Sequence, residues 1–362
     1  MKKTFIILFG ALLLLSCRQK EQEAAVGVYT LKAGDVCLTV TNYGARVMSL
    51  TTPDKEGVSE NIVVGHKTVQ EYITPPGERF LGACVGPVAN RIGGASFEVD
   101  GVEYHTPMND NGHNTLHGGF KGVDHLVWDV VAVCDTAIVL HLLHPDGLEG
   151  YPGNLDMTMT YALNRDNEFT VTYLATTDKA TPVNFSHHPF FCLRGEGNGS
   201  VEDYWMQINA SHYIPIDAES IPTGEIAAVE GTPFDFREPH LIGERIGEEN
   251  EQLRNARGYD HNWCIDKTTD AVEFLCRVWD PVSGRYVEVL SDQPGIQFYS
   301  GNFFDGSENG SNGQPLGFRS SLALEAQKWP DAVHHPSFPS VILRPGEQYS
   351  QICIYRFGVV AE

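Results

Sequence analysis

An alternation of apolar and polar residues with a period of two runs through much of this chain. Between positions 155 and 161, Leu155, Met157, Met159 and Tyr161 are apolar, and the three residues between them are polar. Residues 169–173 repeat the pattern. Successive side chains of a strand point to opposite faces, so such segments bury one face and expose the other. The sequence therefore predicts half-buried strands of antiparallel sheet.

Turn signals support an all-β fold. Residues 97–104 predict a hairpin around Asp100-Gly101, a pair that tolerates the positive φ angles of a tight I′ turn. A second turn is expected at residues 280–284, between strand-like segments. The best helical pattern covers residues 246–257, and we expect a short polar helix on the surface. The fold class predicted is all-β, as a large antiparallel β-sandwich of many strands.

The N-terminus has the layout of a secretory signal. Lys2 and Lys3 precede an apolar run at residues 5–15, which is too short to span a bilayer comfortably. Leu14-Leu15-Ser16-Cys17 resembles a bacterial lipobox, which implies cleavage before Cys17 and lipidation of its thiol. The alternative is an ordinary signal peptide cut near residues 24–25.

This reading divides the chain into three parts. We expect a lipoprotein signal peptide at residues 1–16, a polar tether at 17–26 and a single domain at 27–362, because no linker or repeat interrupts the rest. The expected location is the bacterial cell envelope, as a periplasmic or outer-membrane lipoprotein attached only through Cys17. A formal charge of −22 argues against nucleic acid as a partner, since little could neutralise its phosphates.

The remaining cysteines indicate neither a zinc site nor a disulfide framework. They are odd in number, scattered and without a C-x-x-C pair. We expect most of them to be buried free thiols. The seven are Cys37, Cys84, Cys134, Cys192, Cys264, Cys276 and Cys353.

Two distant stretches carry the groups most suited to chemistry. Residues 181–191 place His188 in an apolar, strand-like segment, and residues 322–327 place Glu325 between small and apolar neighbours. A proton donor and a proton acceptor are the minimum for general acid–base catalysis. Desolvation should raise the pKa of Glu325 and make it a better base at neutral pH. A histidine satisfied within the core is the alternative for His188. In a strand, His187 points to the opposite face, so no metal-binding pair is expected.

Four further segments carry polar groups suited to a hydroxyl-rich ligand. Residues 86–91 end in Asn90 and Arg91, although Arg91 could instead form a surface ion pair. Residues 114–119 place His117 before two glycines, which let backbone approach a ligand. Asp260 stands among aromatic residues, as in many sugar sites, or caps a turn. Residues 293–299 contribute Gln297.

These clusters, in this order, resemble the aldose 1-epimerase family, also called galactose mutarotases. The resemblance extends beyond the polar clusters and covers about residues 27–357. The further matching segments are residues 42–45, 146–153, 221–225, 232–236 and 330–340.

The resemblance implies a function and roles for particular residues. The family fold is a large antiparallel β-sandwich, and its members interconvert the α and β anomers of free aldoses such as D-glucose and D-galactose. His188 matches the general acid that protonates the ring oxygen, and Glu325 matches the base that deprotonates the anomeric hydroxyl. His187 stands where the family usually carries asparagine. Because its side chain should point away from His188, we expect activity to survive.

The same resemblance implies a sugar-binding set and no cofactor. Neither a metal nor a nucleotide is expected, and the expected partner is a monosaccharide. The residues expected to hold the sugar are Asn90, Arg91, His117, Asp260 and Gln297.

Three other functions fit parts of the sequence. A non-catalytic sugar-binding lipoprotein would not need both His188 and Glu325. A glycoside hydrolase using Asp260 and Glu325 would need its two carboxyl groups at a defined separation and would leave His188 idle. A sugar-phosphate epimerase would need more cations than Arg91 alone.

Overall fold

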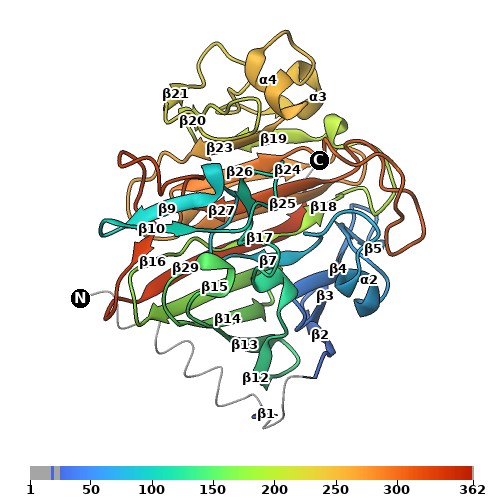
Figure 1. Cartoon of the computed structure of the whole chain (residues 1–362). Helices are drawn as coiled ribbons and strands as arrows, with labels where there is room; N and C mark the ends of the chain where they lie inside the picture. The colour runs from blue at the N-terminus through green and yellow to red at the C-terminus, as the bar shows by residue number, and fades with distance from the viewer. Residues whose placement is uncertain (1–17, 20–24, 361–362) are drawn as a thin grey trace.

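The computed structural model describes residues 18–19 and 25–360. The predicted signal peptide at 1–16 and the lipidation site Cys17 lie outside the described residues, as does most of the predicted tether at 17–26. Two large antiparallel sheets run across the molecule, with α3 and α4 at one end (Figure 1). The predicted fold class, an antiparallel β-sandwich, is confirmed.

The larger sheet has ten strands in the order β1-β12-β13-β14-β15-β29-β25-β24-β19-β22. Strand β1 (Arg18–Gln19) pairs with β12 at one edge. The other strands are β12 (Asp129–Val133), β13 (Ala137–His144), β14 (Leu155–Leu163), β15 (Glu168–Thr177), β29 (Tyr349–Val359), β25 (Arg285–Ser291), β24 (Glu273–Trp279), β19 (Trp205–Ile208) and β22 (His240–Leu241).

The second sheet has seven strands in the order β21-β20-β23-β26-β27-β18-β6. They are β21 (Ala227–Ala228), β20 (His212–Ile214), β23 (Asp260–Cys264), β26 (Gly295–Tyr299), β27 (Leu322–Gln327), β18 (Phe190–Phe191) and β6 (Val63–Val64). A four-stranded sheet contains β2 (Val28–Ala33), β3 (Val36–Thr41), β4 (Arg46–Pro53) and β5 (Ser59–Asn61).

Four short strand pairs complete the fold. They are β8 (Arg91–Ile92) with β11 (Thr115–Leu116), β7 (Ala83–Val85) with β17 (Ser186–His188), β9 (Ser96–Val99) with β10 (Val102–His105), and β16 (Thr181–Pro182) with β28 (Ile342–Leu343). The described helices are α2 (Val69–Ile73), α3 (Ile242–Arg245) and α4 (Glu251–Ala256), with four short 3-10 turns. Within residues 18–19 and 25–360, no helix has the length and apolar character that crossing a membrane requires.

The alternation read from the sequence builds the core between the sheets. Along β14, Leu155, Met157, Met159 and Tyr161 are at most 2 % exposed, whereas the intervening residues are exposed or half-buried. The same apolar cluster includes Leu322, Leu324 and Ala326 of β27. The two sheets therefore share one core. The opposite face of the seven-stranded sheet does not contribute to this core and can carry polar side chains.

The predicted turns are present. Asp100 and Gly101 have φ angles of 54° and 79° between β9 and β10, as a turn with two positive φ angles requires. Residues 280–284 join β24 to β25, where buried Asp280 accepts the Val282 and Ser283 N–H groups.

The predicted helix at residues 246–257 is shorter than expected. Helix α4 begins only after Asn250, whose side chain accepts the Gln252 and Leu253 N–H groups and caps the first turn. It ends at Ala256, and the next residue, Arg257, adopts a left-handed conformation. Ile246 instead closes α3. The cap at Asn250 thus divides what looked like one helix. Helix α4 was expected to lie on the surface, but one side of it is buried, through Leu253 and Ala256.

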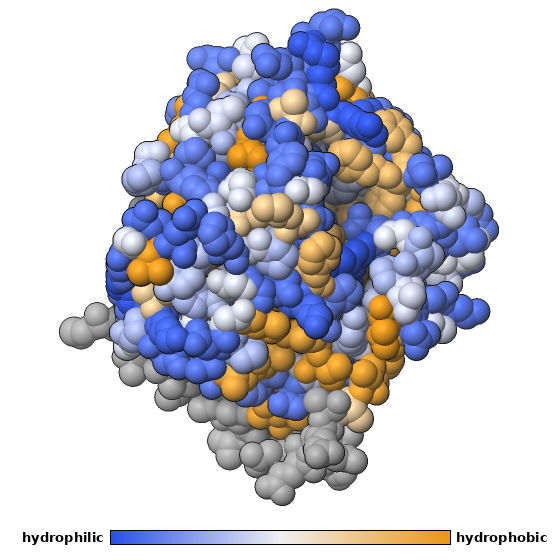
Figure 2. All heavy atoms as spheres, in the orientation of Figure 1, coloured by the Kyte–Doolittle hydropathy of each residue, from blue (hydrophilic) through white to orange (hydrophobic). Residues whose placement is uncertain are grey.

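The surface is largely hydrophilic on the face drawn in Figure 2, with apolar residues gathered towards its lower edge near β12 and β13. In these two strands, Leu143 of β13 is 51 % exposed, and Val130 and Val133 of β12 are half-buried. Cys84, Cys192, Cys264, Cys276 and Cys353 are buried free thiols, as predicted, whereas Cys37 and Cys134 are half-buried.

Candidate active site

A row of polar side chains lies on the face of the seven-stranded sheet that is turned away from the core. Gln297 of β26 stands directly opposite Glu325 of β27, and Tyr299 stands opposite Asp260 of β23. Residues paired in this way project from the same face, as do residues two apart on one strand. Leu324 and Phe298 between them point into the core. The alternation that builds the sandwich therefore also displays Asp260, Gln297 and Glu325 together.

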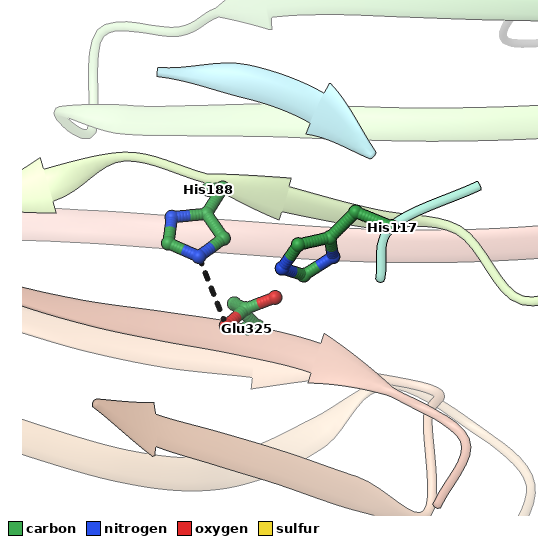
Figure 3. Close-up of side chains that lie close together, drawn as sticks. All are labelled: His117, His188 and Glu325. Carbon is green, nitrogen blue, oxygen red and sulfur yellow. Dashed lines mark ion pairs between the residues drawn. The ribbon is translucent and has the colours of Figure 1, made fainter. Parts of the chain in front are cut away.

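His188 reaches Glu325 from another strand. It ends β17, which pairs with β7 and lies against β27. Its Nε2 lies 3.4 Å from Glu325 Oε1, and the two side chains are 7 % and 2 % exposed (Figure 3). The two residues are 137 positions apart in the sequence, so only the fold could show that they touch.

His187 points the other way, as the strand geometry predicts. Its ring packs in the core against Tyr161, Phe169 and Tyr355, with centroid distances of 5.3, 5.6 and 5.9 Å. His187 and His188 thus do not form a joint metal site, and His187 lies outside the polar cluster.

Two loops bring Asn90 and His117 to the cluster and bind each other tightly. The His117 N–H donates to the Asn90 carbonyl at 2.9 Å, and the Asn90 N–H donates to His117 Nδ1 at 3.0 Å. Their φ angles are 62° and 50°, in the left-handed region that few residues other than glycine occupy. Such strain is held in place only by surrounding contacts and gathers at functional sites.

Arg91 is both an ion-pair partner and a site residue. Its Nε donates to Asp110 Oδ2 at 2.9 Å, and its side chain is 12 % exposed. Among the described residues, neither of its terminal nitrogens has a partner, so both can donate to a ligand. Arg91 thus forms the ion pair that was considered as the alternative, but the pair is half-buried and lies beside the pocket.

These groups surround one pocket with about 460 Å³ of unfilled space, counting its open mouth. That size lies within the usual range for small-molecule sites. The lining residues are Glu78, Phe80, Asn90, Arg91, Leu116, His117, His188, Phe190, Asp260, Tyr299, Phe303 and Glu325.

Six of the seven predicted site residues line the pocket, and Gln297 does not. Gln297 Nε2 instead donates to Asp260 Oδ1 at 2.8 Å and holds that carboxylate in place. Sugar binding by Gln297 stays a prediction. Glu78 and Phe80 also line the pocket but were not predicted, because they come from an irregular loop (residues 74–80) without periodicity or a recognisable motif. The only sequence signal was their position just before the segment that ends in Asn90-Arg91.

Burial sets the electrostatics of the pocket. It lowers the pKa of His188 to about 4 and raises the pKa of Glu325 well above its usual range. The pKa of Asp260 is raised, mainly by burial and against the opposing effect of Arg91. Burial also holds the pKa of His117 well below its usual value. Both partners of the His188–Glu325 pair therefore resist carrying a charge.

His117, His188 and Glu325 could together suggest a metal site, because one ligand atom from each lies within 4.8 Å of the others. The hydrogen bond from the Asn90 N–H to His117 Nδ1 opposes that reading. A neutral imidazole that accepts at Nδ1 carries its proton on Nε2, and a protonated nitrogen cannot ligate a metal. His117 is thereby fixed as a donor towards Glu325 and His188 (Figure 3).

Comparison with known proteins agrees with this geometry. The family model for aldose 1-epimerase matches residues 27–356. The chain belongs to the aldose 1-epimerase family. Galactose mutarotase of Rattus norvegicus is 39 % identical over 335 residues, which cover 92 % of this chain and 95 % of the rat protein. Aldose 1-epimerase of Escherichia coli K12 is 35 % identical, with 88 % of this chain and 91 % of that protein covered.

Solved structures show the same fold. The aldose epimerase homologue from C. elegans superposes with a TM-score of 0.85 at 28 % identity, covering 93 % of this chain and all of that one. Galactose 1-epimerase from Lactobacillus acidophilus gives a TM-score of 0.81 at 27 % identity, covering 96 % and 99 %. Opening and closing a sugar ring requires one proton to be delivered and one to be removed, and a buried histidine–carboxylate pair offers groups of both kinds.

Proposed function

We propose that this protein catalyses the interconversion of the α and β anomers of free aldoses such as D-glucose and D-galactose, with His188 and Glu325 as the proton-transfer groups. One observation carries the proposal: His188 Nε2 and Glu325 Oε1 are 3.4 Å apart and buried in the wall of a polar pocket. Membership of the aldose 1-epimerase family supports the same activity.

Ring opening needs one proton delivered and one removed. With the pair's single proton on His188, the imidazolium donates to the ring oxygen while the Glu325 carboxylate takes the proton of the anomeric hydroxyl. The C1–O5 bond breaks, and the products are the open-chain aldehyde, neutral His188 and protonated Glu325. Rotation about the C1–C2 bond presents the other carbonyl face, and the reverse transfers close the ring to the opposite anomer.

The pair carries one proton throughout this cycle. Burial favours the uncharged form, with neutral His188 and protonated Glu325, which is the form that accompanies the open-chain sugar. The site therefore helps to stabilise the intermediate state of the reaction. Each well-placed proton transfer contributes about 10²- to 10⁴-fold in rate, which suffices for a reaction that proceeds slowly in water.

Neutral His117 and Arg91 are placed to support the transfers. His117 offers its Nε2–H towards the pair, and Arg91 offers its unpartnered terminal N–H groups at the pocket wall. Such fixed donors stabilise negative charge that develops on a sugar oxygen. Asp260, held by Gln297, can accept hydrogen bonds from hydroxyl groups elsewhere on the ring.

The competing functions fit the site less well. A sugar-binding protein has no need of two buried proton-transfer groups in contact. In a glycoside hydrolase, His188 would have no role, although its Nε2 lies 3.4 Å from Glu325 Oε1. A sugar-phosphate epimerase would need cations to bind the phosphate. Among the described residues that line the pocket, Arg91 is the one lysine or arginine, and it is already paired with Asp110.

Polarimetry tests the activity directly. Freshly dissolved α-D-glucose and α-D-galactose should lose their excess optical rotation faster with the wild-type protein. Both Glu325→Gln and His188→Asn should lose most of this acceleration while still binding sugar. Glu196→Gln, a buried carboxylate outside the pocket, provides a matched control and should keep it. Full activity in Glu325→Gln would refute the assigned roles.

We also propose that the mature protein is anchored to the bacterial envelope by lipid at Cys17. The basis is the N-terminal sequence alone, with Lys2 and Lys3, the apolar run at residues 5–15 and the lipobox-like Leu14–Cys17. Metabolic labelling with radioactive palmitate should label the wild type but not Cys17→Ala, and only the wild type should sediment with membranes. Recovery of unlabelled wild-type protein in the soluble cytoplasmic fraction would refute the anchor.

A further inference from the structure

Glu78 places a third carboxylate at the pocket that the proton-transfer mechanism does not use. It lies in the loop at residues 74–80, between α2 and β7, and lines the pocket together with Phe80. The Phe80 ring lies 4.6 Å from that of His117 and 6.3 Å from that of His188, centroid to centroid. Glu78 therefore lines the same pocket as His188 and Glu325.

The loop holds the Glu78 carboxylate through Oε1. Oε1 accepts the Phe80 N–H at 2.8 Å, and the Glu78 N–H donates to Glu308 Oε1 at 2.9 Å. Within the described part of the chain, Oε2 has no hydrogen bond and no ion pair. A carboxylate oxygen fixed in position with free acceptor capacity suits a ligand hydroxyl, which can donate to it.

Charge in the lining points to the kind of sugar admitted. Three carboxyl groups face the pocket, those of Glu78, Asp260 and Glu325, and Arg91 is the one cationic residue among the lining residues. Asp110 already neutralises Arg91 at 2.9 Å. A neutral sugar has no charge to be repelled in such a site, whereas a sugar with its own carboxylate meets several carboxyl groups and no cation that is not already paired.

We propose that Glu78 is a specificity-determining residue: its free carboxylate oxygen accepts a hydrogen bond from a sugar hydroxyl remote from the anomeric centre, and its charge excludes anionic aldoses such as uronic acids. This inference rests on the proposed function for its kinetic test, but sugar binding can be measured without turnover. Burial and the nearby Glu308 raise the pKa of Glu78, so its charge and hence the discrimination should weaken as the pH falls.

The test compares Glu78→Gln with the wild type on D-glucose and D-glucuronate. For D-glucose, KM and the dissociation constant from an NMR titration should both rise by about tenfold, because a charged acceptor is replaced by a weaker neutral one. The kcat for D-glucose should change less than threefold. The ratio of kcat/KM for D-glucuronate to that for D-glucose should rise by about tenfold or more. A merely structural role would not change this ratio.

Glu308→Gln is the matched control. Glu308 accepts the Glu78 N–H but is not part of the pocket lining, and glutamine keeps an accepting oxygen. The control should retain the wild-type preference. Unchanged affinity and unchanged sugar preference in Glu78→Gln would overturn the inference while leaving the epimerase activity established. If the wild type accelerated no mutarotation, the proposed function would fail, and the dissociation constants would still decide the role of Glu78.

Discussion

His188 Nε2 lies 3.4 Å from Glu325 Oε1, and both side chains are almost completely buried. Burial penalises the imidazolium and the carboxylate alike, so the two groups behave as a unit that holds one proton. Adding a second proton removes the base, and taking away the last one removes the acid.

The pair predicts a bell-shaped pH profile for kcat/KM. The acid limb should fall near pH 4, because burial lowers the pKa of His188 to about 4 and a histidine protonated beside protonated Glu325 leaves no base. The alkaline limb should follow the raised pKa of Glu325, where the pair loses its proton. Initial-rate polarimetry, corrected for the buffer-catalysed rate, measures both limbs. An acid limb near the ordinary histidine pKa of about 6.5 would contradict the assignment.

His187→Asn should keep kcat within a few-fold of the wild type, whereas His188→Asn should lose about 10²-fold or more. His187 packs among core rings and does not reach the pocket. A loss of activity in folded His187→Asn equal to that in His188→Asn would show that the residue preceding the acid positions it.

The same variant should make the fold less sensitive to acid. Burial lowers the pKa of His187 to about 3, so below about pH 6.5 the unfolded chain takes up a proton that the folded chain refuses. The stability contributed by neutral His187 is complete above pH 6.5 and is lost as the pH falls towards 3. Between pH 7 and 5 the wild type should lose about 2 kcal/mol more unfolding free energy than His187→Asn, as measured by urea denaturation.

Asp124→Asn should destabilise the fold by about 3 kcal/mol. The carboxylate is fully buried and pairs with Arg46 at 3.3 Å and Arg79 at 2.8 Å, and Arg46 is itself fully buried. Removing the anion leaves the Arg46 charge without its partner. Asp129→Asn, in an exposed position 3.9 Å from His141, is the control and should change stability by less than about 1 kcal/mol. If urea denaturation gave the same loss of unfolding free energy for both variants, the buried ion pairs would stabilise the fold no more than the exposed one.

Gln297→Met should raise KM for D-glucose in the wild-type background but have little further effect in Asp260→Asn. Gln297 is not in the pocket lining, and we expect it to affect the sugar only through its 2.8 Å hydrogen bond to Asp260. A double-mutant cycle should therefore give a coupling energy of about 1 kcal/mol. Additive effects would indicate that Gln297 binds the sugar independently.

Much of the site was readable from the sequence because its signals are local. The alternation along residues 155–161 sets which side chains enter the core, and the same rule places His187 and His188 on opposite faces. Glu325 stands out as a carboxylate in an apolar strand, and the desolvation inferred from its neighbours agrees with its 2 % exposure. These properties depend on residues within a few positions of one another.

Other features were decided only by the tertiary structure. The contact between His188 and Glu325 depends on β17 lying against β27, and the position of Gln297 behind Asp260 depends on the register of β23 with β26. Glu78 belongs to an irregular loop that is held at the pocket by contacts with distant segments, including Glu78 N–H to Glu308 and Arg79 to Asp124. Strand order and loop closure arise from contacts between residues far apart in the chain. The sequence alone thus determined the all-β fold and the chemical character of the site, and the packing of distant segments determined which groups share one pocket.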